Sequence, residues 1–167
     1  MAQGHCERLQ KLMDPLARSM GLSEEFINNL YLLARYHDVG KVAVPDRILF
    51  KRGRLSDAEM REVRQHSEIG SRIAAAVPEI AGIADWILKH HERWDGSGYP
   101  LGLSGDDIPL ACRILALAES YDAMVTDRPN GKATSMEAAI RQIRQNAGHQ
   151  FDPVLAEKFI SVLRQSV

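Results

Sequence analysis

The chain has 167 residues, enough for one domain with a full hydrophobic core and too few for two ordinary domains. Hydrophobic residues make up 45% and charged residues 26%, and the formal net charge is -1, so no global basic field exists to bind DNA without sequence preference. The two cysteines, Cys6 and Cys112, can pair only once, which excludes a disulfide scaffold and makes a reducing, cytoplasmic setting the expectation. No apolar run approaches the roughly 20 residues of a membrane span, and residues 1–4 lack a signal-peptide core.

Apolar residues recur at helical spacing along most of the chain, which predicts an all-α domain. Ser23 and Ser56 are typical helix N-caps, and Ser56 opens a capping box with Glu59. Thr134 and Glu137 suggest a second capping box. The expected helices cover about residues 5–20, 23–37, 56–66, 69–77, 80–91, 109–126, 134–147 and 153–167, with one short turn at 46–50 and a glycine-rich loop at 95–105.

His37 and Asp38 follow an apolar helical stretch, so we expect both to be at least partly buried. A buried carboxylate must be neutralised or paired. An Asp–His hydrogen bond, or an ion pair between Asp38 and Lys41, would meet that need without a metal. For an isolated His–Asp pair, this structural explanation is the stronger one.

His90 and His91 weigh toward a metal site. Two adjacent imidazoles repel each other when both are protonated, but their placement side by side is favourable when each donates a lone pair to a metal. The pair stands between an apolar stretch and the glycine-rich loop. Taken alone, it is equally consistent with two surface histidines.

Three further residues extend this set of candidate ligands. His5 lies on the first expected helix and His66 ends the third, while Glu119 lies within an apolar helix. Pairing of Glu119 with Arg113 or Lys89 is the structural alternative. Five histidines and two carboxylates, with no cysteine among them, exceed one tetrahedral zinc site and suit two octahedral ions such as iron or manganese.

Two blocks of sequence carry a family resemblance: His37-Asp38-Val39-Gly40-Lys41 and His90-His91-Glu92-Arg93-Trp94-Asp95-Gly96-Ser97-Gly98-Tyr99-Pro100. They resemble the HD-GYP family, a branch of the HD metal-dependent phosphohydrolases. The resemblance continues through residues 121–124 and 148–153, so it covers nearly the whole chain. It implies one HD-type domain over residues 1–167, with about seven helices and a long glycine-rich loop. The abrupt helical start leads us to expect that this domain belongs to a longer signalling protein.

The resemblance also implies a role for individual residues. Asp38 and Lys41 would be the catalytic residues, with Asp38 bridging two divalent ions, iron or manganese, and Lys41 contacting a substrate phosphate. The implied metal ligands are His5, His37, Asp38, His66, His90, His91 and Glu119. The further candidates for substrate contacts are Arg113, Arg128 and Lys132. The reaction would be hydrolysis of cyclic di-GMP to the linear dinucleotide pGpG, to GMP, or to both.

Three positions depart from the family pattern. Glu119 stands where the family uses an aspartate, and this changes the reach of the ligand by one methylene. Met1 stands where some members have a glutamate that binds a third metal, so we expect two metals. Arg128-Pro129 is followed by Asn130-Gly131-Lys132 instead of a tyrosine and a basic residue, which removes a group that would face the substrate.

A signalling module with weak or no turnover is the alternative to an enzyme. In that case the loop formed by Gly98, Tyr99 and Pro100 would dock a diguanylate cyclase (GGDEF) or another partner. The intact ligand set favours the enzyme, whereas the altered segment after Pro129 favours the module. Family members usually follow a sensory or receiver domain, and a homodimer stays open. The glycine-tyrosine-proline block disfavours other HD phosphohydrolase substrates.

Overall fold

The computed structural model describes residues 2–127 and 132–165, with the side chains of residues 2 and 3 excepted. These residues form helices and no β-strand, which confirms the all-α expectation. No helix among them is long and apolar enough to cross a membrane. Both cysteines are free. The helices are α1 (Ala2–Ser19), α2 (Glu24–Tyr36), α3 (Asp46–Leu49), α4 (Asp57–Arg64), α5 (His66–Ala75), α6 (Ala84–Lys89), α7 (Leu110–Val125), α8 (Met136–Gln145) and α9 (Pro153–Gln165), with 3-10 turns η1 (Val39–Ala43), η2 (Ala81–Ile83) and η3 (Gly105–Asp107).

Two of the expected helix starts are confirmed. The Ser23 side chain accepts a hydrogen bond from the Phe26 N–H, and Ser56 and Glu59 form the reciprocal capping box at the start of α4. There are more helices than the seven or so expected, partly because the one-turn α3 stands as a helix of its own.

Other boundaries differ from the expectation. His66 begins α5 instead of ending the preceding helix, and Gln65 (φ -64°, ψ -14°) is both the C-cap of α4 and the N-cap of α5. The capping box expected at Thr134 and Glu137 is wrong. The Thr134 hydroxyl donates to the Met124 carbonyl of α7, and Ser135 is the N-cap of α8.

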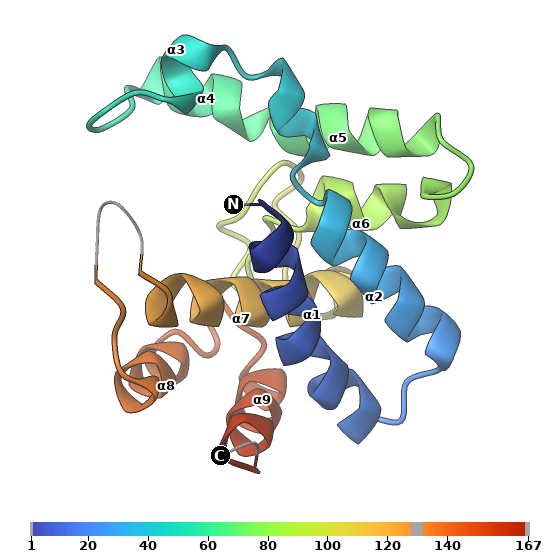
Figure 1. Ribbon diagram of the computed structural model, residues 1–167, viewed down its shortest axis with the longest axis vertical. Coiled ribbons are helices and arrows are strands. Elements are labelled where there is room, and N and C mark those ends of the chain that lie inside the picture. The colour runs from blue at the N-terminus through green and yellow to red at the C-terminus, as the bar shows by residue number, and fades with distance from the viewer. Residues whose placement is uncertain (1, 128–131, 166–167) are drawn as a thin grey trace.

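Helix α7 runs through the middle of the molecule (Figure 1), with α1 crossing one side of it and α8 and α9 packed on another. Its buried residues include Ile114, Leu117 and Ala118, and they belong to a single core shared with α1, α2 and α9. A helix buried on most of its surface is expected to be largely apolar, as α7 is. Its two carboxylates, Glu119 and Asp122, stand out on it.

The antiparallel pair α5 and α6 packs beside α2, and η1 lies directly against α5 (Figure 1). The contact between η1 and α5 depends on Gly40. A Cβ atom at this position would lie 1.9 Å from the His66 carbonyl oxygen and 2.5 Å from the Gly70 nitrogen. Only a glycine can bring η1 this close to the start of α5.

Candidate metal centre

The candidate centre forms where several helices end or begin. His37 is the C-cap of α2 and Asp38 the N-cap of η1, whereas His66 is the first residue of α5. His90 and His91 follow the last turn of α6. The fold thereby brings together chain segments more than 50 residues apart, and one ligand atom from each of Asp38, His66, His90 and His91 lies within 4.8 Å of the others.

Backbone carbonyls fix the orientation of three of the imidazole rings. The Nδ1 of His66 lies 2.7 Å from the Val63 oxygen, and the Nδ1 of His90 lies 2.6 Å from the Ile87 oxygen. The Nδ1 of His37 lies 3.2 Å from the Ala34 oxygen. Because a carbonyl can only accept, Nδ1 carries the proton in each ring and the lone pair is on Nε2. Metal-binding histidines in proteins are commonly oriented in this way.

These Nε2 lone pairs converge. The His66 Nε2 lies 3.4 Å from the His90 Nε2 and 3.1 Å from the His91 Nε2. The His37 Nε2 is buried and has no hydrogen-bond partner among the described residues. Since both His66 and His90 carry their proton on Nδ1, no proton is available to join their Nε2 atoms. A cation held between Asp38, His66, His90 and His91 would satisfy the lone pairs that no proton can join, so these residues fit a bound metal.

The protonation states agree with this interpretation. Burial lowers the pKa of His66 and, more strongly, that of His90, and it lowers the pKa of His91 to about 3. Burial alone would raise the pKa of Asp38, but the adjacent His37 and Lys41 outweigh it and the pKa is lowered. Neutral imidazoles around a charged carboxylate are the states that bind a divalent metal.

Asp38 occupies the centre of the group. Its Oδ1 lies 3.6 Å from the His66 Nε2 and its Oδ2 lies 3.6 Å from the His37 Nε2. The Lys41 ammonium donates to Oδ2 at 2.7 Å, so the ion pair considered as the structural alternative does form. The pair does not explain the His37 Nε2, which has no hydrogen-bond partner among the described residues, or the close approach of the His66 and His90 Nε2 atoms.

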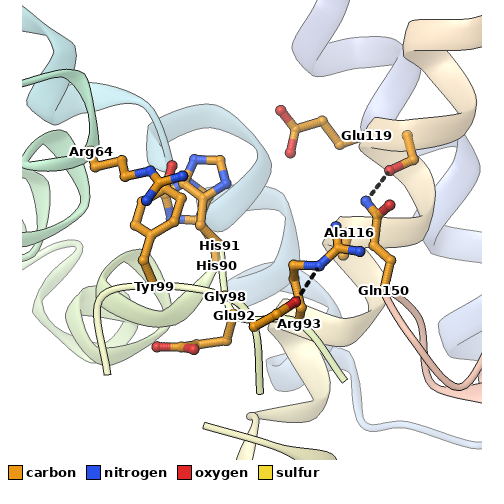
Figure 2. Close-up of a pocket in the computed structure, with 12 residues that line it drawn as sticks. Arg64, His90, His91, Glu92, Arg93, Gly98, Tyr99, Ala116, Glu119 and Gln150 are labelled. Carbon is orange, nitrogen blue, oxygen red and sulfur yellow. Dashed lines mark hydrogen bonds between the residues drawn. The ribbon is translucent and has the colours of Figure 1, made fainter. Parts of the chain in front are cut away.

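His5 and Glu119 approach the group from α1 and α7. The His5 ring centroid lies 6.2 Å from that of His37. Glu119 lines the same cavity as His91, and in Figure 2 its carboxylate extends from α7 toward the side of the cavity that holds His91. The alternative pairings of Glu119 are not seen, because Lys89 binds Asp85 and Arg113 binds other aspartates.

A cavity of about 260 Å³ opens next to the imidazoles. On one side of it, the Tyr99 ring stacks on His91 with centroids 4.8 Å apart, and the Arg64 guanidinium lies 5.0 Å from the Tyr99 ring centroid (Figure 2). Its lining residues are Arg64, His90, His91, Glu92, Arg93, Ser97, Gly98, Tyr99, Ala116, Glu119, Ser120 and Gln150.

The glycine-rich loop is held tightly against this cavity. A Cβ atom on Gly98 would lie 2.4 Å from the Arg93 nitrogen, so glycine is required where the loop folds back on residues 91–93. The buried Glu92 carboxylate accepts the N–H groups of Leu101 at 2.7 Å and Leu103 at 3.0 Å. The loop is therefore a rigid packed element, and it presents Tyr99 to the cavity.

Replacing Glu92 by glutamine is expected to loosen this loop. Glutamine has only one acceptor oxygen for two backbone N–H groups, and leaving a buried group unpaired costs about 1–3 kcal/mol. We expect a lower melting temperature and faster proteolysis within residues 95–105. Glu79→Gln, at an exposed glutamate, is the matched control. Equal melting temperatures and equal cleavage of the two variants would contradict the anchoring role.

The candidate substrate contacts are distributed unevenly. Lys41 lies beside Asp38, whereas Arg113 binds Asp106 at 2.8 Å and Asp152 at 2.9 Å and does not line the cavity. Lys132 is exposed, and Arg128 lies outside the described residues. Arg64 was not among the residues selected from the sequence, although it is a basic residue two positions before a candidate ligand.

Comparison with known proteins agrees with this geometry. The HD domain family matches residues 1–155. A cyclic di-GMP phosphodiesterase of Thermotoga maritima is 40% identical over 163 residues, which are 96% of this chain and 44% of that protein. A 3'3'-cGAMP-specific phosphodiesterase of Vibrio cholerae is 37% identical over 92% of this chain and 30% of its own length. This chain thus spans less than half the length of either relative.

A solved structure shows the same fold. A crystal structure of a cyclic GMP-AMP phosphodiesterase from Vibrio cholerae aligns with a TM-score of 0.76 and 21% identity, covering 96% of this chain and 44% of that chain. The family match, the relatives and the fold agree with the motifs at His37-Asp38 and His90-His91. We conclude that the chain belongs to the HD domain family.

Proposed function

We propose that this domain is a metal-dependent phosphodiesterase that hydrolyses cyclic di-GMP to pGpG, GMP, or both. The observation that carries the proposal is the cluster of His66, His90 and His91 around the Asp38 carboxylate, with His37 3.6 Å from the same carboxylate. Relatives at 35–40% identity are named as phosphodiesterases for cyclic di-GMP or for 3'3'-cGAMP. The shared chemistry is cleavage of a phosphodiester in a cyclic dinucleotide.

Asp38, His37, His66, His90 and His91 would hold the metal, and His5 and Glu119 would complete two sites from α1 and α7. Seven nitrogen and oxygen ligands suit two ions of the iron or manganese type. When bound, such a pair lowers the pKa of water, so that hydroxide is available at neutral pH, and neutralises phosphate oxygens.

The chain's own residues then position the substrate. Lys41 is a donor beside Asp38 and can contact a phosphate oxygen where negative charge develops. Arg64 has no carboxylate partner within the described part of the chain, and a guanidinium can bind a phosphate through two parallel hydrogen bonds. Arg64 is therefore better placed than Arg113 as a second phosphate contact. Arg128 and Lys132 stay candidates on the sequence argument alone.

A docking role for the glycine-tyrosine-proline loop is the weaker proposal. The Tyr99 ring is packed between His91 and Arg64, so the aromatic group best suited to anchor a diguanylate cyclase is engaged inside the cavity. A preceding sensory domain and a homodimer stay predictions from the family resemblance.

Turnover by the metal-loaded domain tests the proposal. Anaerobically purified protein would be analysed for metal content and incubated separately with cyclic di-GMP and 3'3'-cGAMP, with products followed by chromatography and mass spectrometry. We expect about two iron or manganese ions per chain and formation of pGpG or GMP. Preferential cleavage of 3'3'-cGAMP would correct the substrate, and metal binding without cleavage of either dinucleotide would overturn the enzyme in favour of a binding module.

A further inference from the structure

Asp122 is a buried carboxylate on α7 that the ligand assignments leave without a role. Its side chain is 2% exposed. It lies one helical turn after Glu119, and it faces α1, the helix that carries His5. A charged group at this depth needs partners for its lone pairs.

Four donors surround this carboxylate. Its Oδ1 accepts from the Arg8 Nε at 2.5 Å and from the Thr126 hydroxyl at 3.1 Å. Its Oδ2 accepts from the Arg8 Nη2 at 3.1 Å and from the His5 Nδ1 at 2.8 Å. Both oxygens of Asp122 are thus occupied. They join His5 and Arg8 of α1 to Thr126, which lies more than 100 positions later in the chain.

The contact with His5 fixes the state of that ring. A carboxylate held between Arg8 and Thr126 is ionised and can only accept hydrogen bonds. The His5 Nδ1 must therefore carry the proton, and the lone pair is on Nε2. Backbone carbonyls impose the same arrangement on His37, His66 and His90, whereas at His5 the Asp122 carboxylate takes the place of the carbonyl.

We propose that Asp122 is a positioning residue for the metal centre, which orients His5 and holds it in the tautomer whose Nε2 can bind a metal. This inference rests on the metal centre of the proposed function, but not on its substrate or its turnover. Arg8 contributes indirectly, because it pairs with Asp122 and fastens α1 to α7 close to His5.

A purely structural ion pair is the competing explanation. In that case Asp122 would only join α1 to α7, and its loss would lower stability without a specific effect on His5. Thr126 offers a matched control, since Thr126→Val removes one hydrogen bond to the same carboxylate and leaves the His5 contact intact.

The first test measures the tautomer of His5 in the wild-type protein. Histidine 1H–15N correlation spectra of the metal-free protein report which ring nitrogen is protonated, and the His5 signals are identified by their loss in His5→Gln. We expect His5 with the proton on Nδ1. A dominant Nε2–H form in the wild-type protein would overturn the proposal.

The second test measures Mn²⁺ affinity by titration calorimetry in the full chain. We expect Asp122→Asn to weaken Mn²⁺ binding by about 10–100-fold, as loss of an outer partner of a metal-bound histidine does elsewhere. Thr126→Val should change it less than about threefold. In the His5→Gln background, Asp122→Asn should cause no further loss, because the residue through which it acts is gone.

The positioning role would be overturned if the losses of Mn²⁺ affinity from His5→Gln and Asp122→Asn multiplied in the double variant. Equal losses of Mn²⁺ affinity in Asp122→Asn and Thr126→Val would also overturn it. Turnover separates the two proposals. If the wild-type domain binds Mn²⁺ and shows the expected coupling but cleaves neither dinucleotide, the proposed function fails and the role of Asp122 stands.

Discussion

Asp38→Asn is expected to remove both bound metal and phosphodiesterase turnover. Asparagine keeps the shape of the side chain but loses the negative charge that faces His37, His66 and Lys41. Without that charge the centre loses an anionic oxygen ligand that offsets the positive charge of a divalent ion, so metal binding should weaken. Losing an outer partner of a ligand costs up to about 100-fold in affinity or activity, and losing the central ligand should cost at least as much.

Metal content by elemental analysis and turnover by product formation measure this effect separately. Asp107→Asn is the matched control, because Asp107 is exposed and lies away from the imidazoles. The control should retain its metal and full turnover. Loss of a ligand should leave far less than a tenth of the wild-type activity. If Asp38→Asn bound as much metal as the wild-type protein and kept more than about a tenth of its activity, the metal centre would be wrongly placed.

The residue types of this centre could be predicted from the sequence because they are unusual. Buried histidines and carboxylates are rare, so His37-Asp38 and His90-His91 stand out against the apolar stretches before them. The helices were equally predictable, since apolar spacing and the caps at Ser23 and Ser56 are local signals. Each of these features depends on residues at most a few turns apart.

The features that could not be predicted depend on contacts between distant segments. Asp122 and His5 are 117 residues apart, and only the crossing of α1 over α7 brings them together. Arg64 had no local signal beyond its charge, because its place over Tyr99 follows from the packing of the glycine-rich loop. Arg113 shows the reverse case: a cation in the right helix that two aspartates hold outside the cavity.

Gly40→Ala should have the largest effect on stability of any small substitution in this region. The new Cβ would lie 1.9 Å from the His66 carbonyl oxygen and 2.5 Å from the Gly70 nitrogen. Both are backbone atoms, so no change of rotamer relieves the contact, and η1 must move away from α5. Overpacking of this kind costs about 1–3 kcal/mol and occasionally more. At about 2–4 °C per kcal/mol for a domain of this size, the melting temperature should fall by roughly 6–12 °C if the cost is near the upper end.

The same displacement should weaken metal binding, because Gly40 lies two residues after Asp38 and faces the backbone of His66. Moving η1 separates these two ligands, and Mn²⁺ affinity should fall together with the melting temperature. Gly82→Ala provides the control: nothing lies within 4 Å of a Cβ at Gly82, and a surface change there should alter stability by less than about 0.5 kcal/mol. Melting curves and Mn²⁺ titrations of both variants decide the matter. If Gly40→Ala had the same melting temperature and the same Mn²⁺ affinity as Gly82→Ala, the close packing of η1 on α5 would not be what holds Asp38 and His66 together.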